Sequence, residues 1–264
     1  MKKLANSKVR NNINMFFNLS INDFKSKYAS SVLGAVWVYI QPLMNLLVMW
    51  YVFQVGLKNG NVEGVPFIVW FAPASLAWSF VAECISSETM CMKEYSYLVC
   101  KVNFDVKIIP LIKVASGCFV HVAFIIFLYF LCAVYHVPFT VYSLQILYYF
   151  VCMIVHLIGL GWLLSVVTPF FPDMQAIVNV ILQMGFWITP IVWNVNDMSL
   201  FVQRISKLNP MYYIVTGYRD SLVNHIWFWE RWDTTIYYWT ITILLLVFGH
   251  RIFNKVKKHL ADVL

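Results

Sequence analysis

Few residues of this chain have the types and spacing that chemistry needs. There is no GxxxxGKS/T loop, so the chain does not bind a nucleotide in that way, and no HExxH or CxxC pair supplies metal ligands. Gly159 and Gly161 form a GxG without a third glycine, and helix packing explains them better. We interpret the six cysteines as small apolar packing residues. The sequence therefore predicts no catalytic residue, no metal site and no cofactor in this chain.

Three ionisable residues inside apolar runs could still act on protons or ions. His121 and His156 have no carboxylate within their own runs, so we predict buried, hydrogen-bonded imidazoles rather than a proton relay. Glu83 either faces a cavity or lies near the cytoplasmic end of its run and reaches water, and we favour the second alternative. Ion-coupled carriers keep several ionisable residues at mid-membrane, which this chain lacks. Energy for any transport must then arrive from a partner at the cytoplasmic surface.

The composition indicates which elements must hold these residues. Of the 264 residues, 61% are hydrophobic and 12% are charged, whereas soluble domains carry about 25% charged residues. Such a chain cannot cover its surface with polar groups in water, which predicts an all-α membrane protein. The net charge of +7 could suggest nucleic acid, but the basic residues flank the apolar runs and act as topology signals. We predict no nucleic-acid partner, and we find no cleavable signal peptide.

Gaps between charged residues locate the membrane spans. A helix needs about 20 apolar residues to cross a bilayer. The longest gap, residues 114–172, is divided by a turn at His136–Thr140, and Pro169 and Pro172 end the following span. The gaps predict six spans, with the last one starting near Trp232: Trp37–Leu57, Phe67–Ser86, Leu111–Tyr135, Val141–Thr168, Met174–Asn196 and Thr234–His250.

Lysine and arginine counts orient these spans. Six basic residues precede span one, four lie between spans two and three, and four follow span six, which gives 14 on one side against five on the other. The richer side is cytoplasmic. Both termini are therefore predicted to be cytoplasmic, with residues 1–36 as an N-terminal segment, 37–253 as the transmembrane domain and 254–264 as a tail.

Three further segments carry information. Asn18–Val36 places Leu19, Phe24, Tyr28 and Ser31 on one face, which predicts an amphipathic helix at the cytoplasmic interface or an ordinary membrane-surface anchor.

The other two segments lie between spans. The loop Thr89–Pro110 mixes charges with Tyr97, Leu98 and Phe104, which suits either a soluble partner or a solvated connector. Asp197–Asp233 is too apolar for a disordered loop and predicts two short helices broken at Pro210. These helices form either a re-entrant pair or an amphipathic hairpin on the surface.

Four stretches carry a family resemblance that runs from about residue 20 to 222. They are Asp23-x-Lys25-x-Lys27-Tyr28-x-x-Ser31-x-Leu33-Gly34-x-x-Trp37-x-x-x-Gln41-Pro42-Leu43; Tyr97-Leu98-Val99 with Lys101-Val102-Asn103-Phe104 and Ile109-Pro110; Thr168-Pro169-Phe170-Phe171-Pro172-Asp173 with Phe186-Trp187-Ile188-Thr189-Pro190-Ile191; and Leu208-Asn209-Pro210-Met211 with Gly217-Tyr218-Arg219. In order and spacing the chain resembles the membrane subunit of ABC-2-type exporters of bacterial surface polysaccharides, namely O-antigen, group 2 capsule and wall teichoic acid. Asn22-Asp23 and Pro172-Asp173 depart from the Arg-Asp pairs frequent in that family.

The resemblance implies partners and cargo. It implies a homodimer in the bacterial cytoplasmic (inner) membrane, two copies of a separate ABC ATPase that holds ATP and Mg, and a polysaccharide linked to undecaprenyl diphosphate. Contact with the ATPase is expected from Asp23, Tyr28, Tyr97, Lys101 and Phe104. An outer gate is expected in the broken segment 197–224 and includes Asn209, Pro210 and Arg219.

A path for sugars favours aromatic faces with few fixed charges. Candidates for the channel lining lie on spans one and five, beside the polar residues Gln41, Asn45, Gln54, Asn179 and Gln183. They are Tyr39, Trp50, Tyr51, Phe186, Trp187 and Trp193.

Some basic residues have two possible roles. Lys25 and Lys27 are candidates for binding the lipid diphosphate, with a positive-inside signal as the alternative role. Arg219 is expected to form an ion pair with Asp220 or Glu230 rather than to bind a ligand.

Two other functions compete with polysaccharide export. An ABC-2 permease could move a drug or a small lipid, but the short outer loop between spans one and two and the Leu33-Gly34-x-x-Trp37 entry favour polysaccharide. A membrane enzyme acting on lipid-linked sugars would need a carboxylate pair or a metal constellation, and the sequence offers neither.

Overall fold

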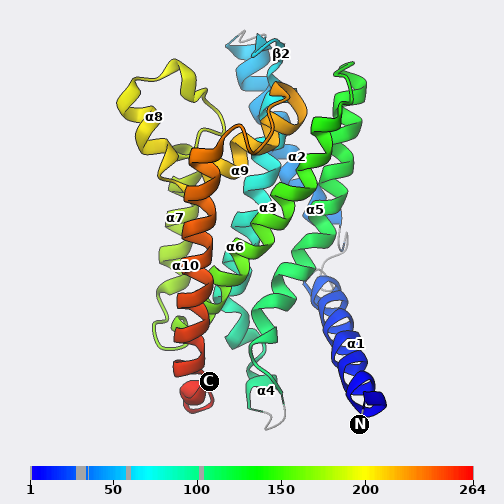
Figure 1. Cartoon of the computed structure of the whole chain (residues 1–264), viewed down its shortest axis with the longest axis vertical. Helices are drawn as coiled ribbons and strands as arrows, with labels where there is room; N and C mark the ends of the chain where they lie inside the picture. Colours follow the sequence, from blue (N-terminus) through cyan, green and yellow to red (C-terminus); the bar gives the residue numbers. More distant parts are fainter. Residues whose placement is uncertain (1, 28–33, 35, 58–60, 101–103, 264) are drawn as a thin grey trace.

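The chain folds as a bundle of long helices. The computed structural model describes residues 2–27, 34, 36–57, 61–100 and 104–263. Beside the helices, the strands β1 (Asn61–Val62) and β2 (Val65–Pro66) form a small antiparallel hairpin. The two chain ends and α4 (Ser96–Val99) lie at one end of the bundle, and the hairpin and α8 (Leu200–Lys207) lie at the other (Figure 1). The three segments rich in Lys and Arg thus gather at one end, which is the pattern that the charge count requires.

Helix α3 (Phe67–Glu94) is the centre of the core. Its first half is buried on every side, including Val69, Phe71, Ala72 and Leu76, and such an all-round apolar helix belongs inside a bundle. It contacts helices on several sides, namely α5 (Ile108–Val134), α6 (Ile146–Val167), α7 (Met174–Ile188) and α9 (Pro210–Arg219).

Five helices are long and apolar enough to cross a membrane. They correspond to predicted spans one, two, three, four and six, and they cover Val36–Gly56, Phe67–Glu94, Ile108–Val134, Val141–Val167 and Trp232–Leu260. The first consists of α2 (Val36–Trp50) and the π-helical turn η1 (Tyr51–Gly56). The fourth begins with the 3₁₀ turn η2 (Val141–Gln145) before α6, and the turn expected at His136–Thr140 separates it from α5. The last consists of α10 (Trp232–Val256) and the start of the 3₁₀ turn η5 (Lys257–Asp262).

Two predicted boundaries in the transmembrane region are wrong. Helix α3 continues to Glu94 instead of ending near Ser86, so the connector to α5 is 95–107 and not Thr89–Pro110. Charged side chains end an apolar run without ending a helix, and Glu88 and Lys93 lie within α3. Conversely, α7 ends at Ile188 and not at Asn196, because Pro190 disfavours helical backbone at the residue before it.

The N-terminal helix also differs from the prediction. Helix α1 covers Lys2–Ser26, whereas the pattern indicated Asn18–Val36, of which residues 28–33 and 35 lie outside the described part of the chain. An apolar face repeats only over part of α1, and the polar residues before it contain no helix breaker, so periodicity located the helix too late. Phe16 and Leu19 pack on a small cluster with Ile109 and Phe253, near the end of the bundle that carries the termini.

The segment between α7 and α10 confirms the prediction of two short helices. After the 3₁₀ turn η3 (Val195–Asp197), α8 runs to Lys207 and α9 begins at Pro210, followed by the π-helical turn η4 (Asp220–Asn224). The Asn209 side chain caps α9 by accepting a hydrogen bond from Met211 N at 2.9 Å, and proline suits the first helical position.

Helices α6 and α10 approach each other closely. A Cβ at Gly159 would lie 3.0 Å from Leu246 N, and one at Gly249 would overlap Gly159 O. The two helices also share hydrogen bonds, from Tyr238 Oη to Cys152 O at 2.8 Å and between His156 Nδ1 and Thr242 Oγ1 at 2.9 Å. Gly159 therefore serves helix packing, as the sequence indicated.

Gly161 serves a different contact. A Cβ there would overlap the carboxylate of Glu88, a fully buried side chain whose two oxygens have no hydrogen-bond partner among the described residues. Glycine is needed because α6 passes directly over this carboxylate.

Candidate functional site

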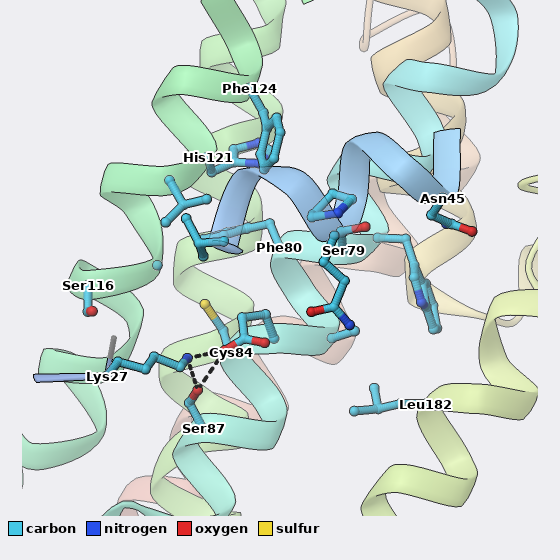
Figure 2. A pocket seen from close by; sticks show the side chains of 18 of the residues that line it. Lys27, Asn45, Ser79, Phe80, Cys84, Ser87, Ser116, His121, Phe124 and Leu182 are labelled. Atoms are coloured by element: carbon cyan, nitrogen blue, oxygen red, sulfur yellow. Dashed lines mark hydrogen bonds and ion pairs between the residues drawn. The ribbon is translucent and has the colours of Figure 1, made fainter. Parts of the chain in front are cut away.

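A large cavity lies between α2, α3, α5 and α7, beside the end of α1. Its volume is about 850 Å³. Trp37, Gln41 and Trp187 on its wall are exposed, which shows that the cavity is open to the surface of the chain. Figure 2 shows part of its lining, with His121 and Phe124 from α5 and Ser79, Phe80 and Ser87 from α3. Polar lining residues include Asp23, Lys27, Gln41, Asn45, Glu83, Lys113 and Gln183, and aromatic ones include Phe24, Trp37, Trp78, Phe186 and Trp187.

The charged lining residues gather toward the end of the bundle that carries the termini. Lys27, at the end of α1, pairs with Glu83 on α3 and donates to Ser87 Oγ at 3.0 Å (Figure 2). Both members of the ion pair are half-exposed, so water screens it. Glu83 lines the cavity and is also half-exposed, so each of the two alternatives for it describes part of the result.

A second charged cluster ties α1 to the rest of the bundle. Lys113 on α5 contacts Asp23 at 2.5 Å and Glu94 at 2.6 Å, and its ammonium lies 5.0 Å from the ring centre of Tyr95. Tyr95 donates to Asp23 at 2.7 Å. Asp23 and Lys113 are only 5% and 7% exposed, so each needs the other. Burial and the Asp23 carboxylate raise the pKa of Tyr95 far above its usual range, which keeps the phenol a donor.

The remainder of the cavity wall is neutral. Trp78 and Phe186 meet edge to face with ring centres 6.5 Å apart, and Phe186 meets Trp187 at 5.4 Å. The amides of Gln41, Asn45 and Gln183 line the same space. Aromatic faces beside a few amides are the composition of a pocket for a polar, uncharged ligand.

Both intramembrane histidines are buried and hydrogen-bonded, which confirms the prediction for them. His121 Nε2 lies 2.7 Å from Tyr218 Oη, and its ring stacks on Phe80 with centres 4.6 Å apart. His156 pairs with Thr242. His121 thus links the wall of the cavity to α9, in the segment between α7 and α10.

The predicted channel-lining residues divide into two groups. Phe186 and Trp187 line the cavity. The others do not line it.

The second group has other surroundings. Tyr39 packs edge to face on Phe124 at 5.8 Å, Trp50 is half-buried against the core, and Trp193 donates to Trp187 O at 2.9 Å. Tyr51, the first residue of η1, is 61% exposed. A channel role for these four residues stays a prediction.

The two candidate diphosphate ligands also differ. Lys27 lines the cavity and is held by Glu83 and Ser87, whereas Lys25 is exposed and is not part of the lining. Lys27 is thus the lysine of the two that lines the cavity, and diphosphate binding by either one stays a prediction.

The predicted ATPase contacts have diverse surroundings. Tyr97 is 58% exposed on α4, and Phe104 is half-buried beside the cluster that includes Ile109. Asp23 is buried and forms an ion pair with Lys113, so it connects α1 to α5 within the chain. Tyr28 and Lys101 lie outside the described residues.

Arg219 does not form the predicted ion pair. Its guanidinium donates to three backbone carbonyls, Trp70 O at 3.1 Å and Pro190 O and Ile191 O at 2.6 Å each, and lies 3.5 Å from the ring centre of Trp70. Arg219 thereby fixes the chain after α7 to the start of α3. Carbonyl acceptors leave no mark in a sequence, so charge pairing was the wrong criterion.

Asp220 pairs instead with Arg231, and it also accepts a hydrogen bond from Asn224 at 3.0 Å. Burial raises the pKa of the Asp220 carboxyl although Arg231 and Asn224 favour its charged form. Glu230 accepts from Trp227 N at 3.1 Å. The Asn209 amide of the predicted gate donates to Thr189 Oγ1 at 2.8 Å, so Asn209 and Arg219 both hold the segment after α7.

In the part of the chain that is described, no group of three His, Cys, Asp or Glu side chains could hold a metal ion. The cysteines are free; Cys84, Cys91, Cys132 and Cys152 are buried, Cys118 is half-buried and Cys100 is exposed.

The sequence does not indicate several residues that line the cavity. Trp78 and Phe80 lie in an apolar run in which no aromatic residue stands out from the others, and the place of Lys113 at a loop edge indicates a topology signal. The pairing of Asp23 with Lys113, 90 residues apart, has no sequence signal.

Comparison with known proteins gives a consistent picture. A family model described as ABC-2 type transporter matches residues 15–223. The chain is 23% identical over 262 residues to the O-antigen export system permease protein RfbA of Klebsiella pneumoniae, covering 97% of this chain and 99% of that protein. It is 22% identical over 217 residues to the protein of the same name from Myxococcus xanthus, covering 80% and 81%.

Proposed function

The chain belongs to the ABC-2 type transporter family, and from this premise we propose that it is the membrane subunit of an ATP-driven exporter of undecaprenyl-diphosphate-linked polysaccharide. The observation that carries the proposal is the cavity, whose charged rim and aromatic, amide-lined wall suit a lipid diphosphate followed by sugars. Relatives named O-antigen export permeases support this cargo over a drug or a small lipid, with capsule and teichoic acid as related cargoes.

We propose six spans in the bacterial inner membrane, with both termini in the cytoplasm. Five helices have the required length, and α7 supplies the sixth span. Its 15 residues extend about 22 Å, less than the ~30 Å hydrocarbon core. Non-helical residues after α7 must complete the crossing, and backbone of this kind needs protein or water around it. Helices α8 and α9 would re-enter beside it as the outer gate, and α1 would lie at the cytoplasmic interface.

The motor would be a separate subunit. We expect a homodimer with two ABC ATPase subunits that bind ATP and Mg, since this chain has no nucleotide loop. The exposed Tyr97 on α4 is a contact candidate that the described surface supports, together with Phe104. Asp23 of α1 is hydrogen-bonded to Tyr95, which lies between α3 and α4, and to Lys113 of α5. A movement of α1 or of α4 would therefore be passed on to the charged rim of the cavity.

The lipid diphosphate would bind at the charged rim. Lys27 is the leading ligand, with Lys25 nearby on the exposed side of the same helix end. In this structure Lys27 forms an ion pair with Glu83, so the diphosphate must displace this carboxylate from the lysine. Both side chains are half-exposed and screened by water, so breaking the ion pair costs little free energy.

Alanine substitution of channel aromatics tests this function. In cells that depend on this permease, Trp187→Ala is expected to lower surface polymer about twofold to tenfold, the value of one aromatic contact. Tyr51→Ala tests the part of the predicted channel outside the cavity. Surface polymer is measured by immunoblot against the amount of permease in the membrane.

Trp232→Ala is the matched control, because Trp232 is 68% exposed at the start of α10 and does not line the cavity. Normal export by Trp187→Ala at normal protein level would contradict the cavity as the cargo path. Equal losses in all three variants would indicate general damage.

A further inference from the structure

Helix α7 carries a stripe of amide side chains that its apolar composition does not require. Gln175, Asn179 and Gln183 are spaced four residues apart, which places them on one side of the helix. Gln175 Nε2 donates to Ser86 Oγ on α3 at 2.9 Å and to Asn179 Oδ1 at 3.2 Å. The stripe therefore follows the side of α7 next to α3 and reaches the cavity at Gln183.

These amides are only partly satisfied by hydrogen bonds among the described residues. Asn179 and Gln183 are exposed, and Gln175 Oε1 is buried without a partner among the described residues. An amide that faces hydrocarbon leaves its donors and acceptor without hydrogen-bond partners, which is energetically costly. A stripe in an otherwise apolar helix is therefore expected to face a hydroxyl-bearing or aqueous environment.

The facing helix adds groups of the same kind. Gln41 and Asn45, four residues apart on α2, line the same cavity as Gln183. Each amide offers two N–H donors and one carbonyl acceptor, which matches a sugar hydroxyl that both donates and accepts. The flat rings of Trp78 and Trp187 add apolar surface for the faces of sugar rings.

Charge distinguishes between two classes of polymer. The charged residues that line the cavity are Lys27 with Glu83 and Lys113 with Asp23, and each lysine already has its carboxylate. Along the amide-lined part of the wall, the lining residues include no cation. A polymer with a phosphate or carboxylate on every unit would lose hydration there and gain no counter-charge.

Resting on the proposed function, we propose that this cavity selects an uncharged glycan, with hydroxyl-rich sugar units recognised by the amides of α2 and α7, and disfavours a polyanionic chain. The single lipid diphosphate stays at the charged rim. The sugars beyond it occupy the neutral wall.

The decisive experiment measures ATP hydrolysis by the complete permease–ATPase complex in nanodiscs. One probe is undecaprenyl diphosphate carrying an uncharged hexose oligosaccharide, and the other is the same lipid carrying poly(glycerol phosphate) of equal length. We expect the uncharged probe to stimulate ATP hydrolysis several-fold more than the phosphate polymer. Equal or stronger stimulation by the phosphate polymer overturns the selectivity but leaves polysaccharide export intact. Stimulation by neither probe, with basal hydrolysis present, overturns the proposed function itself.

Variants on α7 and α2 locate the selectivity. Gln183→Leu and Gln41→Leu, which change amides that line the cavity, are each expected to weaken the response to the uncharged probe about twofold to tenfold, the value of a hydrogen bond. Met184→Leu is the matched control, because Met184 is exposed on α7 and does not line the cavity. Gln183→Lys should not improve the response to the phosphate polymer if the wall is built for uncharged sugars. A response to the uncharged probe that survives both leucine variants overturns the assignment to these amides.

Discussion

The α6–α10 pair and the α2–α7 pair have similar apolar compositions but opposite surroundings. At the α6–α10 contact, glycines bring the backbones together, and His156 and Tyr238 find partners across it. In the fully described helices α2 and α7, by contrast, only Leu46 and Val178 are buried, and the amides of Gln41, Asn45 and Gln183 line the cavity.

The difference shows that helices of similar composition can serve either packing or ligand binding. One pair uses its polar groups to lock helices together, so its side chains cannot change without loss of the fold. The other leaves its polar groups available to a ligand, so its changes should affect transport more than stability. Substitutions in the two regions can test this separation.

The largest effect is expected at Arg231, directly before α10. Arg231→Met leaves the buried Asp220 carboxylate without its cation, which should lower the free energy of unfolding by about 3–5 kcal/mol. Thermal unfolding followed by circular dichroism in detergent measures the change. Lys207→Met is the control, because its ion pair with Asp233 is half-exposed, and it should cost far less. Equal costs would show that burial does not govern these pairs.

A smaller loss is expected from crowding the α6–α10 contact. The new Cβ of Gly249→Ala meets Gly159 O, so the helices must separate, at about 1–3 kcal/mol of stability. Gly56→Ala is the matched change beside the other pair, since its Cβ would lie 3.6 Å from Tyr51 O, an ordinary contact. If both alanine variants unfold at the wild-type temperature, the close α6–α10 approach is not a source of stability.

The smallest effect on stability is expected at the cavity rim. Glu83→Gln removes the screened pair with Lys27 and should change the free energy of unfolding by less than about 1 kcal/mol. Freed from Glu83, Lys27 should bind an undecaprenyl-diphosphate vesicle more strongly, as measured by co-flotation. A large loss of stability here would erase the contrast between the two regions.

The sequence predicted those features that depend on local pattern. Charge gaps located the long helices, Pro210 marked the break between α8 and α9, and the absence of carboxylates near His121 indicated a structural imidazole. Each of these is decided by neighbours within one or two helical turns.

Features that depend on distant partners could not be predicted. Glu88 lies beyond the predicted end of span two at Ser86, yet it belongs to α3 and α6 covers it at Gly161. Arg219 finds backbone carbonyls instead of an acid, and Phe186 and Trp187 line the cavity while Tyr51 does not. These outcomes follow from which helix faces which, and hydropathy carries no such information.

The distribution of thiols has a practical consequence. Cys100, directly after α4, is exposed, whereas Cys84, Cys91, Cys132 and Cys152 are enclosed by the bundle. A maleimide fluorophore added to the folded protein should therefore label Cys100, next to α4, without any engineered cysteine. The emission of this fluorophore would report on the surface where we propose that the ATPase binds.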